Sequence, residues 1–106
     1  MVKRGEIWLV NLDPTVGSEI KRTRPCVVIS PPEMHNYLRT VIVAPMTTGS
    51  HPAPFRIALR HGGKEGLILL DQIRTVDKTR LVKRAGAIAP AVLSSTLAVL
   101  AEVFAE

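Results

Sequence analysis

The chain has a single cysteine and no long apolar run, and each shortage excludes a class of protein. Cys26 cannot form an internal disulfide, and its place in the apolar segment 26–29 predicts a small buried residue in a reducing compartment. Nowhere do about 18 apolar residues run together, as a membrane-spanning helix requires. The charged N-terminus lacks the apolar stretch of a signal peptide, so we expect a cytoplasmic protein.

Most catalytic signatures are missing as well. The chain has no cysteine pair, no phosphate-binding glycine loop, no Gly-x-Ser-x-Gly elbow and no His-Glu-x-x-His helix. His35, His51 and His61 stand in loop-like stretches without ligand spacing, so we expect surface or turn histidines. The carboxylates are spread singly, unlike the clusters of two-metal nucleases. We therefore expect no metal and no cofactor.

The composition, with 46% hydrophobic and 22% charged residues, predicts a single soluble domain that spans residues 1–106. A net charge of +5 favours a polyanionic partner without proving one. Basic residues gather in the segments 21–24 and 74–84. For either cluster, a solvated surface explains the charge as well as an anion-binding site does.

Short apolar runs separated by proline and glycine predict a mainly β fold, a small barrel or sandwich of antiparallel strands. The expected strands cover residues 7–12, 26–29, 41–44, 55–59, 66–70 and 81–88. The second of these is apolar throughout and should be central, whereas the fourth alternates and should have one solvated face. Seven of the eight prolines fall at boundaries of apolar runs: Pro14, Pro25, Pro31, Pro32, Pro45, Pro52 and Pro54.

The eighth proline, Pro90, opens a predicted C-terminal helix that runs to about Phe104. Leu93, Leu97 and Leu100 belong with Phe104 to a broad apolar stripe on this helix. Such a stripe packs either on the barrel or on a second subunit, and the sequence favours neither.

The segment 13–25 is a long polar connection between two strands, although a hairpin needs only about two to five residues. It carries both an acid, Glu19, and a fixed cation, Arg24. Connections of this length are usually functional loops or floppy insertions. From the spacing alone, a surface turn with solvated charges is an equally good interpretation.

Ordered motifs cover nearly the whole chain: Arg4-Gly5-Glu6-Ile7-Trp8, Leu12 to Glu19, Arg24-Pro25, Val28-Ile29-Ser30, Pro45-Met46-Thr47-Thr48 and Leu70 to Asp77. Together they resemble the MazF, PemK and Kid ribonuclease toxins of bacterial toxin–antitoxin modules. The resemblance implies a homodimer of SH3-like barrels with short helices and a C-terminal helix, a fold shared with CcdB. It also implies metal-free cleavage of single-stranded RNA at short motifs, leaving a 2′,3′-cyclic phosphate and a 5′-hydroxyl, and inhibition by an acidic antitoxin.

The same resemblance assigns roles to individual residues. Glu19 takes the position of the general base, and Arg24 that of the catalytic arginine, which stabilises the phosphorane charge first and acts as an acid second. Thr47 matches a threonine that hydrogen-bonds the scissile phosphate. Further residues are expected to contact the RNA: Ser18, Lys21, Arg22, Asn36, Thr48, Asp71, Gln72 and Arg74. The segment 20–23 departs from many relatives, so the resemblance predicts no particular cleavage motif.

Two other functions remain open on the sequence. One is a gyrase-directed toxin like CcdB, which has a similar fold but poisons a protein complex. The other is a non-catalytic RNA-binding barrel, for which the basic segments are sufficient. The pair Glu19 and Arg24 separates them from an endoribonuclease, because only RNA cleavage uses both side chains.

Overall fold

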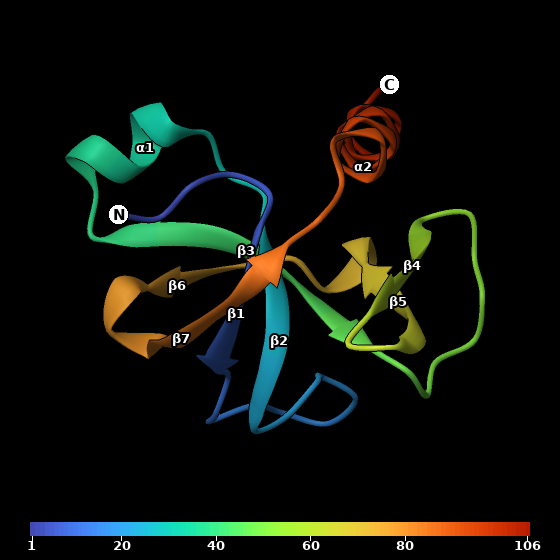
Figure 1. The fold of residues 1–106 in the computed structure, drawn as a ribbon, viewed down its shortest axis with the longest axis horizontal. Coiled ribbons are helices and arrows are strands. Elements are labelled where there is room, and N and C mark those ends of the chain that lie inside the picture. Colours follow the sequence, from blue (N-terminus) through green and yellow to red (C-terminus); the bar gives the residue numbers. More distant parts are fainter.

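The computed structural model describes all residues, 1–106, as a curled antiparallel sheet with two helices (Figure 1). The strands are β1 (Glu6–Asn11), β2 (Thr23–Val28), β3 (Thr40–Thr47), β4 (Arg56–His61), β5 (Lys64–Leu69), β6 (Arg74–Asp77) and β7 (Leu81–Ala87). The helices are α1 (Pro32–Tyr37) and α2 (Pro90–Val103), with short 3-10 turns η1 (Leu70–Gln72) and η2 (Lys78–Arg80). The predicted mainly β fold with a C-terminal helix is confirmed. Neither helix has the length and apolar character needed to cross a membrane.

The sheet curls around β3. Its strand order is β4-β5-β3-β2-β1-β7, and β6 pairs with the first half of β3 while β5 pairs with its last two residues. Ile29 N–H donates to Ile42 O, so the backbone groups of Ile42 face β2. Backbone groups point to opposite sides at successive residues of a strand, so the backbone nitrogen of Pro45 faces away from β2. There the β6 pairing has ended and the β5 pairing has not begun, so the missing donor of Pro45 breaks no ladder hydrogen bond. The prediction that Pro25 and Pro45 stand at strand boundaries is wrong, because both lie inside strands.

The central strand β2 is buried on both faces, as predicted for the segment 26–29. One face joins a cluster of Val10, Leu12, Cys26, Val28, Val41, Val43 and Val76. The other face joins Ile7, Val27, Ile29, Ala44, Met46, Ile68, Leu70 and Ile88, against which α2 packs. Burial raises the pKa of the Cys26 thiol to about 12, so this cysteine is a protonated core residue.

The apolar runs in the sequence did not predict β6 or α1. Strand β6 has four residues of which only Val76 is buried, too few to form an apolar run. Helix α1 begins at Pro32, where the proline pair predicted only a strand boundary. This helix turns His35 into the core, where its Nε2 lies 2.6 Å from Ser30 Oγ and its Nδ1 lies 3.1 Å from Val2 O. The prediction of a surface or turn histidine is therefore wrong for His35, whose ring is buried with both nitrogens partnered.

The β4–β5 hairpin is longer than predicted and brings two side chains to its tip. The two strands continue to the pair His61 and Lys64, across a two-residue turn at Gly62 and Gly63. Both glycines have positive φ, 60° and 76°, which is the conformation that a tight hairpin turn requires. At the other end, Phe55 lies outside β4 and is 40% exposed, although it was expected inside the strand.

Candidate active site

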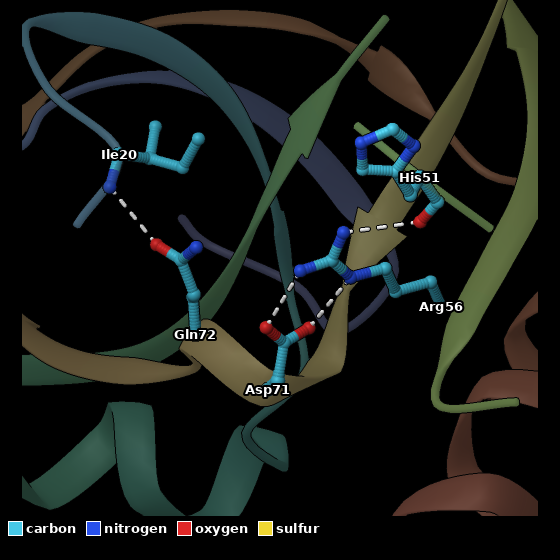
Figure 2. A network of polar contacts seen from close by, with 5 residues as sticks. All are labelled: Ile20, His51, Arg56, Asp71 and Gln72. Carbon is cyan, nitrogen blue, oxygen red and sulfur yellow. Dashed lines mark hydrogen bonds and ion pairs between the residues drawn. The ribbon is translucent and has the colours of Figure 1, made fainter. Parts of the chain in front are cut away.

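The β1–β2 connection is held in a defined shape by hydrogen bonds within it and to η1. Arg22 adopts a left-handed φ of 67°, which is uncommon for a residue other than glycine, and its N–H donates to Asp13 Oδ1 at 2.9 Å. Ile20 N–H donates to Gln72 Oε1 at 2.9 Å, which fastens the loop to η1 (Figure 2). The loop is thus an ordered part of the surface, and the interpretation as a floppy insertion is set aside.

A cavity of about 350 Å³ lies between this loop and η1, and we call it the loop cavity. It is lined by Leu12, Ser18, Glu19, Ile20, Pro45, Asp71, Gln72, Ile73 and Arg74. The Glu19 carboxylate accepts a hydrogen bond from Val16 N–H at 2.5 Å. The side-chain oxygen of Gln72 is occupied by Ile20, so its amide NH2 is the group left to bind a ligand, as a donor. The structure brings together five of the predicted site residues here.

A second cavity of about 200 Å³, the arginine cavity, adjoins the first along β3. Its lining residues are Arg24, Pro25, Met46, Thr47, Thr48, Leu59, His61, Lys64 and Gly66. Arg24 Nε donates to Lys21 O at 3.2 Å, and its two terminal nitrogens have no protein partner. No carboxylate lines this cavity, which therefore suits an anion. Three of the predicted site residues, Arg24, Thr47 and Thr48, line this cavity together.

A close approach of two strands shapes the arginine cavity. A Cβ atom added at Gly66 would lie 3.0 Å from the backbone oxygen of Thr47, so any other residue would push β5 and the end of β3 apart by a few tenths of an ångström. Thr47 Oγ1 accepts a hydrogen bond from Gly49 N–H at 3.3 Å. Its hydroxyl hydrogen is then available to an incoming acceptor.

Beside the loop cavity, a contact that we call the Arg56 clamp joins β4, η1 and the β3–β4 loop (Figure 2). Arg56 donates to both carboxylate oxygens of Asp71, at 3.1 and 3.0 Å, and to His51 O at 3.0 Å. The hydrogen bond from Arg56 holds the pKa of Asp71 below its ordinary value. Asp71 was expected to accept from an RNA base, but Arg56 already engages both of its oxygens.

The second basic segment is mostly occupied with structural contacts. Arg74, Lys78 and Arg80 each donate to a backbone carbonyl of a distant segment, and Arg84 Nε pairs with Glu6 Oε2 at 2.7 Å. These contacts hold β6, η2 and β7 against the rest of the barrel. The exposed basic residues of the β1–β2 connection make fewer such structural contacts and are the better anion-binding candidates.

Not all predicted site residues come together. No hydrogen bond or ion pair links Glu19 to Arg24, since the two line adjoining cavities. Lys21 and Arg22 are exposed on the loop and line neither cavity. Asn36 also lines neither, and it lies on α1, at the far end of the sheet from the β1–β2 connection (Figure 1). No three His, Cys, Asp or Glu side chains gather as metal ligands would.

The Arg56 clamp gives a testable pH dependence. The pKa of Asp71 is depressed in the folded protein, so the pair stabilises the fold above about pH 4 and loses this effect as the pH falls through the folded pKa. We expect Arg56→Met to unfold at lower urea concentration than the wild type at pH 7, with the difference narrowing below about pH 4.

The matched control for the clamp is Arg60→Met. Arg60 is on the same strand and pairs with Glu65 at 3.4 Å, but the two side chains are 67% and 81% exposed. This variant should unfold close to the wild type at every pH. A urea-midpoint difference for Arg56→Met that stays constant from pH 7 to pH 3 would contradict the assigned role of the Asp71 pair.

The fold and the two cavities define a small half-open β-barrel that presents a cationic pocket beside the β1–β2 connection that carries Glu19. The chain belongs to the family of PemK-like, MazF-like toxins of type II toxin–antitoxin systems, whose sequence model matches residues 3–104. The resemblance seen in the sequence is thereby confirmed.

Individual relatives agree with this assignment. The chain is 36% identical over 102 residues to endoribonuclease PemK of Escherichia coli, covering 91% of this chain and 77% of the relative. It is 39% identical over 90 residues to endoribonuclease MazF of Staphylococcus epidermidis, covering 79% and 75%.

Solved structures share the fold. The crystal structure of MazF from Deinococcus radiodurans superposes with a TM-score of 0.84 at 24% identity, covering 96% of this chain and 94% of that one. A mycobacterial endoribonuclease in complex with its cognate antitoxin gives 0.81 at 20% identity, covering 96% and 93%.

Proposed function

We propose that this protein is the endoribonuclease toxin of a toxin–antitoxin module and cuts single-stranded RNA in the cytoplasm at short sequence motifs. The observation that carries the proposal is the arginine cavity, which joins Arg24 and Thr47 in a cationic pocket without a carboxylate. RNA brings its own nucleophile in the 2′-hydroxyl, so the protein need only remove a proton and bind the phosphate. Cleavage then needs no metal and leaves a 2′,3′-cyclic phosphate and a 5′-hydroxyl.

In the proposed mechanism the scissile nucleotide bridges the two cavities. The terminal nitrogens of Arg24 bind the phosphate as a two-pronged donor, and the Thr47 hydroxyl adds a hydrogen bond. Glu19, in the loop cavity, accepts the proton of the 2′-hydroxyl. The remaining RNA contacts that we propose are Ser18, Lys21, Arg22, Thr48, Asp71, Gln72 and Arg74. Asn36, on α1, would be reached only by a longer RNA.

The direct test is cleavage of a mixed single-stranded RNA by the purified protein in excess EDTA. We expect cleavage to proceed at the same rate as without the chelator, because no step uses a metal. RNA that stays intact while gyrase-dependent DNA breaks appear would favour a CcdB-like toxin. Tight RNA binding without products would favour a non-catalytic barrel.

We also propose a homodimer and an acidic antitoxin as partners. Helix α2 carries one charged side chain, Glu102, and its apolar end residues Val103 and Phe104 remain exposed, so it has material for a two-fold interface. The antitoxin segment would cover Arg24 and the exposed Lys21 and Arg22, and so exclude RNA. Sedimentation of the toxin alone as a monomer at micromolar concentration would contradict the dimer.

Charge should dominate recognition of the antitoxin. We expect the dissociation constant of the toxin–antitoxin complex to rise steadily with salt concentration, because exposed charges are screened over about 10 Å at 0.1 M ionic strength. Titration of the two purified proteins at several salt concentrations measures this dependence. An affinity that is indifferent to ionic strength would argue against a charge-led contact.

A further inference from the structure

The arginine cavity has two ionisable side chains to which the proposed mechanism gives no role, His61 and the exposed Lys64. His61 is half-buried at the tip of the β4–β5 hairpin and lines the cavity together with Arg24, Thr47 and Lys64. Its ring lies against β7, where a Cβ atom added at Gly86 would be 3.6 Å from its Cε1. The ring therefore lies next to Gly86 at the wall of the cavity.

The ring nitrogens of His61 are free for a ligand. None of the hydrogen bonds or ion pairs of the protein engages them, whereas both nitrogens of the buried His35 are partnered. Among the three histidines, His51 is exposed and contributes only its backbone oxygen to a contact. His61 is thus the histidine that lines the cavity with both ring nitrogens available.

The proposed cleavage lacks a good proton donor at the departing 5′-oxygen. A guanidinium group has a pKa above about 12 and gives up a proton reluctantly, so Arg24 suits charge stabilisation better than acid catalysis. The threonine hydroxyls of the cavity are weaker acids still. Imidazole is the side chain whose two protonation states are both accessible near neutral pH.

We infer that His61 is the general acid of the cleavage reaction, an assignment that rests on the proposed ribonuclease function. The 2′-hydroxyl proton passes to the Glu19 carboxylate, and the new bond forms between the 2′-oxygen and phosphorus. The bond between phosphorus and the 5′-oxygen breaks, and a ring N–H of protonated His61 gives its proton to that oxygen. Glu19 and His61 line different cavities, which places base and acid at separate points, as a displacement with opposed entering and leaving oxygens requires.

The test compares two RNA substrates with His61→Gln. In one the leaving atom is the natural 5′-oxygen, and in the other it is sulfur, which departs as a thiolate without needing a proton. We expect the variant to cut the oxygen substrate about 100- to 10,000-fold more slowly than the wild type and the sulfur substrate at nearly the wild-type rate. The control His51→Gln should cut both substrates at the wild-type rate.

The outcomes distinguish this inference from the function on which it rests. If the wild type cuts neither substrate, the proposed function itself fails. If the wild type cuts both substrates, the ribonuclease function holds. If circular dichroism also shows that His61→Gln and the smaller His61→Asn are folded, the rates of these variants test the acid role by itself. An unchanged rate on the oxygen substrate, or an equal loss on both substrates, would overturn it.

Discussion

Arg24→Ala should slow RNA cleavage at least about 100-fold, the cost of removing a donor that stabilises charge in a transition state, or about 3 kcal/mol. Arg24 stands at the start of β2, and Lys21 O holds its Nε so that the terminal nitrogens are left for the phosphate. Lysine keeps the charge but loses the paired donors, so Arg24→Lys should fall between alanine and the wild type. The measurement is the single-turnover rate on a defined single-stranded RNA.

A change of net charge alone is controlled by Arg39→Ala. Arg39 is exposed and lines neither cavity, and its replacement removes the same unit of charge as Arg24→Ala. It should cut at close to the wild-type rate. If Arg24→Ala and Arg39→Ala behave alike, Arg24 contributes only to the long-range field and its assignment to the phosphate is wrong.

Glu19→Gln should slow cleavage about 100- to 10,000-fold, the range typical for loss of a general base. The replacement is close in shape, and the amide oxygen of glutamine can still accept the hydrogen bond that Val16 N–H gives to the carboxylate. The β1–β2 connection therefore keeps its form, and the anchor from Ile20 to Gln72 is untouched. The loss should appear in the turnover number and not in RNA affinity.

The matched control for the base is Glu33→Gln on α1, an exposed carboxylate outside both cavities. It removes the same charge and should leave the rate unchanged. Full activity of Glu19→Gln would mean that another group takes the 2′-hydroxyl proton. Weaker RNA binding with an unchanged turnover number would assign Glu19 to substrate binding instead.

The fold was largely predictable because burial leaves a simple record in the sequence. The segment 26–29 is apolar throughout and proves to be the doubly buried centre of the sheet, and the helix predicted from Pro90 ends within one residue of its expected end. Strand β6 and helix α1 could not be found in this way. Both are short and mostly exposed, so neither produces an apolar period.

The residues of the candidate site could be predicted only where they lie together in one continuous segment of the chain. The motifs around Glu19, Arg24 and Thr47 singled out these three residues as candidates. The partners that their side chains and those of neighbouring residues meet depend on strand register, which the sequence does not show directly. Arg56 meets Asp71 because Gly62 and Gly63 form a two-residue turn that pairs position 56 with 69. That glycine pair was the signal that sequence analysis could have used.

The sequence also could not predict which cavity His61 lines. Its place in the sequence, next to two glycines, indicated only a turn. The close approach of β5 to β3 at Gly66 and the packing of the ring against Gly86 bring it to Arg24, and neither contact has a local signature. Likewise, the basic segment 74–84 suggested an anion-binding surface, while most of its cations bind backbone carbonyls or Glu6.

Metal-free cleavage of RNA by its own 2′-hydroxyl is tested most directly by the chemistry of the product ends. A defined single-stranded RNA is incubated with the wild type or Arg24→Ala in excess EDTA, and the ends of the fragments are mapped and identified. We expect 5′-hydroxyl and 2′,3′-cyclic phosphate ends at a short recurring motif, and almost no such ends with the variant. Fragments with 5′-phosphate ends, or cleavage that stops in EDTA, would contradict it.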